Sequence, residues 1–407
     1  MDLVSQIMVW GFVIALVMGM VSSKTHFCTM GAVSDWVNMG DLGRMRAWVL
    51  AVATAIIAVA ILDSAAGVDM SLTTSGATGK PPYATPSFVW LRFVLGGLLF
   101  GIGMTLGSGC GNKTLVRIGG GNLKSVIVFL VMGATAWLMI YTNFSYNVFL
   151  SWMTPLAIDF TSYGLDSQRL STLLTLIVGE PGASLHLITG IVLAAVMFSW
   201  VLSDRSIRSD YNNLLSGLTV GLAVAGVWWL TAGTLGQALL EEIDFMDRRL
   251  YDAGAQSFTF VKPSAHFYYF LQGDSSLLWR GLSFALLAAV GVVAGSFLYS
   301  LLFGKLRIEW FSSLSDFARH AIGGALMGIG GVLSLGCTFG QAITGASTLA
   351  IGSFLTFAMI ILGAALTMKV EYYRIVYEDE GSFPKILAAS LADLHLLPDR
   401  WRCLDKV

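Results

Sequence analysis

The chain has 407 residues, of which 56% are hydrophobic and only 12% are charged, and its formal net charge is −1. Soluble domains carry about 25% charged residues, so this composition excludes an ordinary soluble protein. The near-zero net charge gives no indication of a nucleic-acid partner, and the N-terminal segment MDLVSQIMVW lacks the basic region of a cleaved signal peptide.

Apolar stretches of about 20 residues, the length that crosses about 30 Å of hydrocarbon, recur along the chain. They predict an all-α polytopic membrane protein with nine transmembrane helices. The expected spans are residues 3–22, 47–66, 88–107, 123–141, 185–203, 213–232, 277–303, 320–336 and 351–369.

Basic residues predict how these spans are oriented, because cytoplasmic loops are enriched in lysine and arginine. The segments after spans 1, 5 and 7 and the C-terminal tail are basic, whereas the loops 67–87 and 142–184 hold only Lys80 and Arg169. The 233–276 loop is assigned to the outside despite its basic residues, since long loops follow the rule weakly. The predicted orientation is N-terminus out and C-terminus in.

A repeat relates the two halves of the chain. With Cys110 aligned to Cys337, residues 96–110 match residues 323–337 at nine of fifteen positions. Spans 3 and 8 would run in opposite directions, so we expect two inverted repeats with short broken or re-entrant helices at the midplane, an architecture typical of transporters. The predicted division is a first repeat over 1–141, an outer loop and connector helix over 142–212, a second repeat over 213–369 that includes the outer loop 233–276, and a cytoplasmic tail over 370–407.

Glycines in the repeated segment have a packing interpretation. They form small-xxx-small faces, which let membrane helices approach closely. The predicted faces consist of Gly97 with Gly101 and of Gly324 with Gly328.

Three of the four cysteines stand where a helix is expected to break. At Cys28, Cys110 and Cys337 apolar sequence gives way to polar, irregular sequence, which survives at membrane depth only when buried in protein or lining a cavity. An isolated membrane cysteine is usually a small buried hydrophobe, but three thiols at three breaks favour a functional role. Cys403 lies in the tail and keeps the packing interpretation. No CxxC pair occurs, and no metal or cofactor is expected.

Neutral thiols suit contact with a soft anion. A thiolate would repel an anion and would be costly to bury, whereas a neutral S–H is a weak donor on a polarisable sulfur. A ladder of such thiols could pass a sulfur-bearing anion along weak successive sites.

Three segments carry a resemblance to a known family: HFCTMG at 26–31, LGSGCGN at 106–112 and LGCTFGQ at 335–341. From Val9 to about Met368 the chain resembles the YeeE/YedE family of bacterial sulfur-compound transporters. The resemblance implies thiosulfate uptake across the bacterial inner membrane, through an hourglass of two cavities with the three cysteines at the constriction. It also implies a cytoplasmic sulfur-carrier or sulfurtransferase protein that drains the product. The substrate stays open between thiosulfate and selenium or another sulfur species.

Polar residues and glycines beside the cysteines complete the predicted site. Asn112 and Gln341 could donate amide hydrogens to the oxygens of the anion, although capping of a broken helix explains them equally well. Gly109 and Gly336 each precede a cysteine and are assigned to the same substrate-binding site. The basic residues near the cysteines predict an inner vestibule that attracts anions. It consists of Lys24, His26, Lys113 and Arg117. The alternative explanation is that these residues are ordinary positive-inside anchors.

Two other classes of function are weighed against transport. A membrane thiol or persulfide redox protein would need two cysteines within disulfide reach and a lowered thiol pKa. A structural subunit would account for the long loops and the tail but not for three polar breaks. An enzyme is not expected. Asp63, near the end of span 2, is interpreted as a solvated helix end rather than a proton relay.

Overall fold

The computed structural model describes residues 2–65, 67–68, 70, 83–179, 183–244, 254–272, 282–377, 381–402 and 404. Within these ranges nine helical stretches are long and apolar enough to cross a membrane, which confirms the predicted number of spans. Five are unbroken helices: α3(Gly43–Ala65), α6(Leu123–Tyr141), α9(Ala183–Leu202), α14(Phe284–Leu302) and α16(Ile351–Tyr377).

The other four stretches are each broken into two or more helical segments, as expected for spans 1, 3 and 8. These pairs are α1(Leu3–Thr25) with α2(Thr29–Met39), α4(Trp90–Leu106) with α5(Gly111–Gly119), α11(Tyr211–Ala232) with α12(Thr234–Asp244), and α15(Leu314–Leu333) with the π-helix η7(Thr338–Gly345) and the short η8(Ala346–Thr348).

Shorter elements connect the spans. Two residue pairs, Ser87 with Asp159 and Phe88 with Ile158, join β1(Ser87–Phe88) to β2(Ile158–Asp159) as an antiparallel ribbon. The remaining elements are η3(Tyr146–Leu150), α7(Ser151–Met153), η4(Thr154–Leu156), η5(Phe160–Tyr163), α8(Leu170–Val178), α10(Arg205–Ser209), α13(Lys262–Leu271), α17(Phe383–Asp393) and η9(Asp399–Trp401).

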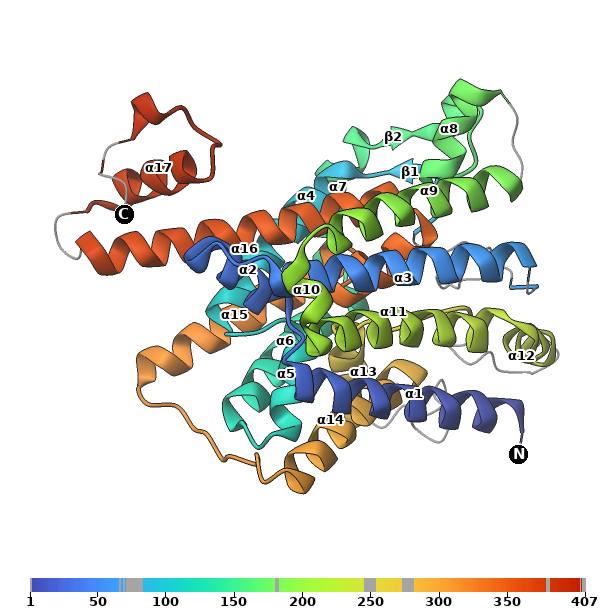
Figure 1. The fold of residues 1–407 in the computed structure, drawn as a ribbon, viewed down its shortest axis with the longest axis horizontal. Helices are drawn as coiled ribbons and strands as arrows, with labels where there is room; N and C mark the ends of the chain where they lie inside the picture. The colour runs from blue at the N-terminus through green and yellow to red at the C-terminus, as the bar shows by residue number, and fades with distance from the viewer. Residues whose placement is uncertain are drawn as a thin grey trace.

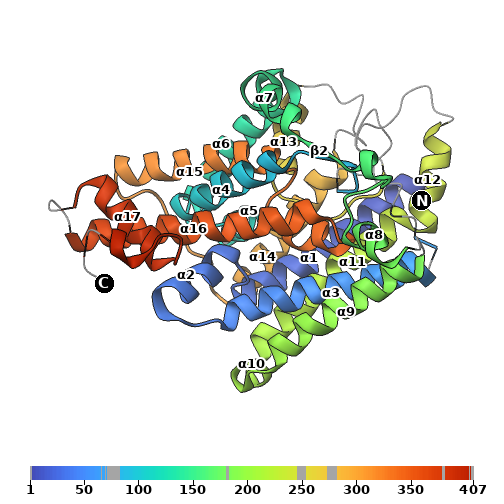
Figure 2. The same cartoon turned by 90° about the horizontal axis from the view of Figure 1, so that it is seen from above.

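The long helices lie side by side, and the two chain termini lie at opposite ends of the bundle (Figures 1 and 2). The N-terminus, α8 and α12 lie toward one end, and α17 lies toward the other. An odd number of crossings requires this separation of the termini. Which end faces the cytoplasm stays a prediction.

Glycines allow close helix contacts at positions that the sequence predicted. Gly101 of α4 lies against α16, where an added Cβ would come within 2.2 Å of the Ile360 carbonyl oxygen. Gly328 of α15 lies against α6 in the same way, with an added Cβ 2.5 Å from the Met132 carbonyl oxygen. Each broken helix therefore packs on an unbroken helix of the other half of the chain.

The helices α4 and α15 also pack directly against each other. Gly96 faces Gly330, and Gly103 faces Gly323. Contacts in this crossed order require the two helices to run antiparallel, as spans 3 and 8 were expected to do. The inverted relation of the complete halves stays a prediction.

One segment of the predicted outer loop 233–276 is part of the core. Phe258, Phe260 and Val261 are almost completely buried. Residues 255–261 are therefore not a peripheral loop, and the physical reason is the aromatic and aliphatic content of FTFV at 258–261, which gains free energy by burial. Arg248 and Arg249 lie outside the described residues.

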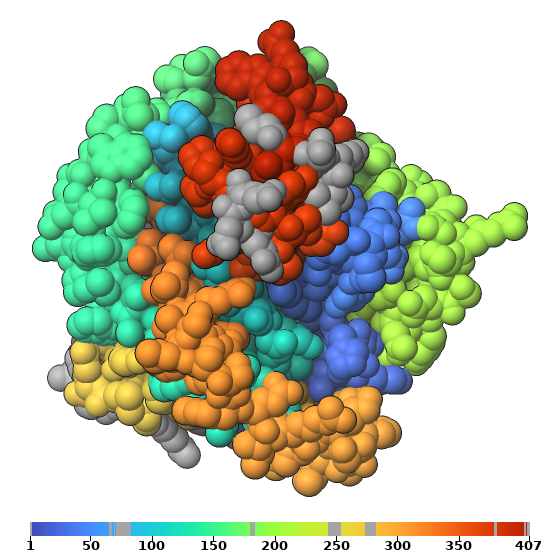
Figure 3. Space-filling view, turned by 90° about the vertical axis from the view of Figure 1, so that its left-hand side faces the viewer, coloured from blue at the N-terminus to red at the C-terminus, as the bar shows by residue number. Residues whose placement is uncertain are grey.

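The C-terminal tail folds back onto the end of α16, at the end of the molecule that Figure 3 faces. Asp393 of α17 accepts ion pairs from Lys369 at 3.3 Å and from Arg402 at 2.6 Å. Its side chain is only 2% exposed, so these contacts hold the tail against the span.

Candidate functional site

The three cysteine-containing helix breaks share one backbone arrangement. The residue two positions before each cysteine is left-handed, with φ of 55° at His26, 57° at Ser108 and 66° at Leu335. Each cysteine is then extended and is the N-cap of the segment that follows it, α2, α5 or η7. Non-glycine residues with positive φ are uncommon and gather at functional sites. The predicted breaks at the cysteines are confirmed.

The predicted glycines take part in ending the helices. The amide of Gly109 donates to the Met104 carbonyl at 2.9 Å, and the amide of Gly336 donates to the Gly331 carbonyl at 2.7 Å. These are the long-range bonds of a Schellman motif, which satisfies the last carbonyls of a helix. A direct contact of Gly109 and Gly336 with substrate stays a prediction.

The three thiols are buried close to one another. Cys28 is 4% exposed, and Cys110 and Cys337 are 0% exposed. The thiols of Cys28 and Cys110 are close enough to interact directly, and Thr338 lies beside Cys110. Because Thr338 directly follows Cys337, the two repeat-related breaks meet here. The structure thus brings together the three cysteines that the sequence placed far apart.

The Cys337 sulfur is surrounded by hydrogen-bond donors. It accepts from the Phe260 amide at 3.3 Å and from the Gly340 amide at 3.4 Å, and the Thr259 hydroxyl lies 4.0 Å away. The helices α2, α5 and η7 each begin directly after one of the cysteines. A helix N-terminus carries partial positive charge. Such an environment favours an electron-rich guest.

Aromatic rings pack between the cysteine-bearing segments. Phe27 stacks on Trp48 with ring centroids 4.6 Å apart, and the Phe339 ring meets Trp48 edge-on at 5.5 Å. Phe260 meets the same Phe339 ring at 5.2 Å. All four rings are buried, so this conformation is closed around the thiols.

The two predicted amide side chains behave differently. Asn112 is fully buried, and neither its Nδ2 nor its Oδ1 has a hydrogen-bond partner in the described part of the chain. Gln341 is hydrogen-bonded at both ends of its amide: its Nε2 donates to the Ser334 carbonyl at 2.6 Å, and its Oε1 accepts from the Ser353 hydroxyl at 2.6 Å. In this conformation Gln341 performs the helix-capping role, whereas Asn112 is available to a ligand.

The predicted vestibule residues are also distinct in their surroundings. Lys113 is the one that lies close enough to act on both Cys28 and Cys110. Arg117 donates to the Ser108 carbonyl at 2.6 Å and so stabilises the end of α4. Lys24 lies over the Tyr211 ring, 5.3 Å from its centroid, and His26 is exposed. Lys305 and Arg44 approach His26 as well, which adds two cations that the sequence did not suggest.

Sequence reasoning missed the contribution of residues 255–261 and of Trp48. The segment is too short for a hydropathy window, and its partner Cys337 lies 77 positions away from Phe260 in the chain. The aromatic pattern FTF was the one available signal. Cys403 lies outside the described residues.

Titratable ligand groups do not gather into a metal site in the described ranges. No cluster of three or more histidine, cysteine, aspartate or glutamate side chains there could hold an ion.

Within the described part of the chain, nine membrane-length stretches, four of them broken, and buried thiols at three breaks define a polytopic membrane protein with the architecture of a transporter. The family described as Sulphur transport matches residues 24–366, and the chain belongs to this family. The resemblance carried by the three cysteine motifs is therefore confirmed.

Two relatives are similar over nearly their whole length. The thiosulfate transporter TsuA of Spirochaeta thermophila is 24% identical over 368 residues, which cover 88% of this chain and 97% of the relative. The thiosulfate transporter TsuA of Escherichia coli strain K12 is 21% identical over 379 residues, which cover 89% of this chain and 94% of the relative.

Proposed function

We propose that this protein carries thiosulfate, or a closely similar sulfur anion, inward across the bacterial inner membrane. The names of the two relatives support the substrate. The observation that carries the mechanism is the burial of three free thiols, from three separate helix breaks, beside an Asn112 side chain without a partner in the described ranges.

In this proposal the terminal sulfur of the anion contacts the thiols, and its oxygens accept from polar groups. Cys28 and Cys110 form one contact point, and Cys337 forms the next. The amide of Asn112 replaces part of the water that the oxygens lose. Weak successive contacts let the anion leave as readily as it enters.

The predicted vestibule residues supply positive charge near the thiols. Lys113 is next to Cys28 and Cys110, so it would attract the dianion past the thiols. His26, Lys24 and Arg117 extend this inner vestibule. The orientation with N-terminus out and C-terminus in, and the two inverted repeats, belong to the same proposal.

Energetics require a driver for this step. Moving two negative charges inward against 100 mV costs about 4.6 kcal/mol, at about 2.3 kcal/mol for each charge. A cytoplasmic sulfur-carrier or sulfurtransferase protein that consumes the product would keep the inner concentration low.

Uptake of ³⁵S-labelled thiosulfate into cells that lack other sulfate and thiosulfate importers tests the proposal. Cys110→Ala and Cys337→Ala should each lower the initial rate at least tenfold at matched expression, and Cys403→Ala, outside the matched region, should not. Wild-type uptake with both core variants unimpaired would refute the thiol ladder. If the wild type does not import thiosulfate, the same assay is run with selenite. Uptake of selenite would then support the selenium alternative.

The proximity of Cys28 and Cys110 favours a second candidate, the membrane thiol or persulfide redox protein. The two thiols lie near enough to influence each other, and a redox pair requires such proximity. Intact-mass measurement before and after reduction separates the two functions. A redox protein shows a reversible loss of two hydrogens that Cys28→Ala abolishes, whereas a thiol ladder keeps both thiols reduced during turnover.

A further inference from the structure

A second polar site lies far from the tail, at the end of the bundle that holds α8 (Figure 1). There a pocket of about 650 Å³ opens between the 163–166 loop, α8 and the ends of α3 and α9. Ligand pockets have volumes of about 300–1,000 Å³, so it can hold a small molecule. None of its lining residues belongs to the thiol site.

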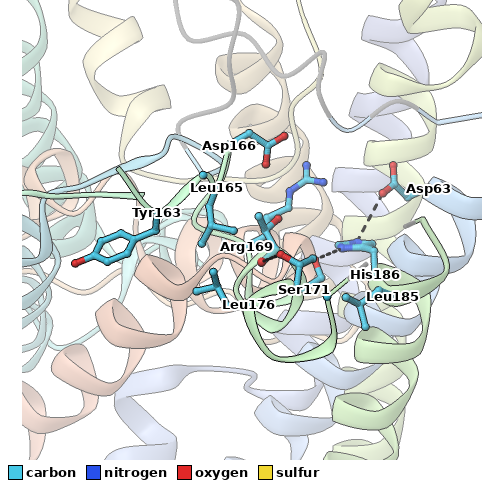
Figure 4. A pocket seen from close by; sticks show the side chains of 13 residues that line it. Asp63, Tyr163, Leu165, Asp166, Arg169, Ser171, Leu176, Leu185 and His186 are labelled. Carbon is cyan, nitrogen blue, oxygen red and sulfur yellow. Dashed lines mark hydrogen bonds and ion pairs between the residues drawn. The ribbon is translucent and has the colours of Figure 1, made fainter. Parts of the chain in front are cut away.

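Three of these residues form a connected chain in Figure 4. The Ser171 hydroxyl lies 2.9 Å from Nδ1 of His186, and Nε2 of the same ring lies 3.7 Å from a carboxylate oxygen of Asp63. They come from α8, α9 and α3, so tertiary packing alone brings them together. Asp63 is therefore paired with His186 and not simply a solvated helix end, as its sequence position had suggested.

The order of these contacts favours one placement of the protons. A carboxylate accepts a hydrogen bond only, so Asp63 favours the histidine tautomer that carries its proton on Nε2. Nδ1 is then an acceptor, and the Ser171 hydroxyl donates to it. A hydroxyl that donates to a histidine oriented by a carboxylate is the arrangement of an activated serine nucleophile. Such contacts are often loose until a substrate binds, which accommodates the 3.7 Å distance.

The backbone around Ser171 supplies the remaining group. Ser171 is the second residue of α8, whose N-cap is Arg169. An α-helix leaves its first amides without an intrahelical acceptor, and those of Ser171 and Thr172 belong to this set. The amide of the residue after a nucleophile is a frequent oxyanion donor. The start of α8 is held in place by the Leu170 amide, which donates to the Leu349 carbonyl at 2.8 Å.

We propose that this pocket is an acyl-transfer site that hydrolyses small carboxylic esters, with Ser171 as nucleophile, His186 as general base and Asp63 as the residue that positions it. The Ser171 oxygen bonds to the acyl carbon while its proton moves to Nδ1 of His186. The tetrahedral oxyanion is bound by the amides at the start of α8. When it collapses, the carbon–oxygen bond to the alcohol breaks, and the alcohol takes the proton from His186.

Water completes the cycle. It adds to the acyl-serine, gives its proton to His186, and the carboxylic acid leaves as Ser171 regains a proton. Leu165, Leu176 and Leu185 line the pocket together with Arg169, so a short apolar acyl group attached to a small polar alcohol fits it best. The activity goes beyond the proposed transport function and involves none of its residues.

The test uses the full-length protein purified in detergent. A fluorophosphonate probe should label it at Ser171, identified by mass spectrometry of the modified peptide, with loss of fluoride. Ser171→Ala should abolish labelling, and His186→Ala should slow it by about 10²-fold or more, the usual contribution of a general base. Asp63→Asn should lower the rate in the same direction. Hydrolysis of p-nitrophenyl acetate should follow the same order.

Ser162→Ala is the matched control, because Ser162 is an exposed serine of the same connection and should leave labelling unchanged. Gel filtration and the apparent Tm show whether each variant is folded. If folded wild-type protein labels no faster at Ser171 than at Ser162, Ser171, His186 and Asp63 form only a structural hydrogen-bond cluster and the proposal is overturned. Labelling at Ser171 that folded His186→Ala leaves unchanged overturns it as well.

Discussion

Gly103 of α4 lies directly against Gly323 of α15. A Cβ added at Gly103 would come within 2.7 Å of the Gly323 carbonyl oxygen, and one added at Gly323 would come within 2.4 Å of the Gly107 amide nitrogen. The two backbones touch with no side chain between them. The two broken helices that carry Cys110 and Cys337 are held together at this point.

Gly323→Val should therefore separate α4 from α15 and destabilise the fold. The neighbouring atoms are backbone and cannot rotate away, and overpacking of this kind costs about 1–3 kcal/mol or more. We expect a lower apparent Tm and a lower yield of monodisperse protein. Gly226→Ala is the control, because its added Cβ meets nothing closer than 3.8 Å. Equal stability of the two variants would contradict the close packing.

Substitutions of the buried amide residues Asn112 and Gln341 should affect transport and stability differently. Asn112→Ala removes a side chain that has no partner in the described ranges, so we expect an unchanged or higher apparent Tm together with at least a tenfold loss of uptake. Gln341→Ala leaves the Ser334 carbonyl and the Ser353 hydroxyl unsatisfied, at a cost of about 1–3 kcal/mol.

Measuring uptake and the thermal unfolding of both variants in parallel checks this pair. Asn112→Ala with full uptake would remove Asn112 from the proposed path. Gln341→Ala with an unchanged Tm would show that its two hydrogen bonds do not stabilise the break.

Much of the fold could be predicted because it follows from local sequence. Hydropathy over about 20 residues locates a span, and the change from apolar to polar sequence at Cys110 and Cys337 located their helix breaks. The start of α15 was harder to predict from the sequence. The helix begins at Leu314, six residues before the predicted start. Ser313 caps it by accepting a hydrogen bond from the Asp316 amide at 3.1 Å. The charged first turn lowers the average hydropathy and hides it.

The contacts that make the two candidate sites depend on tertiary structure instead. Phe260 reaches Cys337 only because residues 255–261 return to the core, and no periodicity signals so short a return. Ser171, His186 and Asp63 occupy three elements, and only their packing shows that they touch. The cysteine motifs were predictable as a group because each carries its own break signal.

Ser108 offers a test of the strain at the breaks. Its φ of 57° places an L-residue in the left-handed region, which costs about 1–2 kcal/mol relative to glycine. Ser108→Gly should raise the apparent Tm, while its carbonyl still accepts from Arg117. Ser108→Val should lower the Tm, because a β-branched residue tolerates this conformation poorly.

Both variants remove the same hydroxyl from the same position, so the loss of that hydroxyl does not account for a difference between them. If the glycine variant is less stable than the valine variant, the left-handed conformation at Ser108 is not the origin of strain. Uptake by Ser108→Gly then shows whether a fixed backbone two residues before Cys110 is needed for transport.

The tail provides the last prediction, which concerns pH. Burial of Asp393 opposes its charge, but hydrogen bonds from Arg402 and Tyr373 and the nearby charge of Lys369 outweigh burial and hold the pKa of Asp393 below its ordinary value. A carboxyl group whose pKa is depressed on folding contributes stability above its unfolded pKa, which is about 3.9, and this stability is lost as the pH falls through the folded value. Docking of α17 should therefore be constant from neutral pH down to about pH 5 and should weaken only in stronger acid.

Asp393→Asn should release the tail at neutral pH, because Lys369 and Arg402 lose their common partner. Limited proteolysis detects the release as faster cleavage within residues 381–402, and hydrogen exchange detects it as lost protection of α17. Asp399→Asn is the control, since Asp399 is 79% exposed and its ion pair with Arg402 is worth little in water. Equal cleavage of both variants and the wild type would mean that apolar contacts, chiefly the burial of Ile386 and Ala389 against Tyr373, hold the tail without the ion pairs.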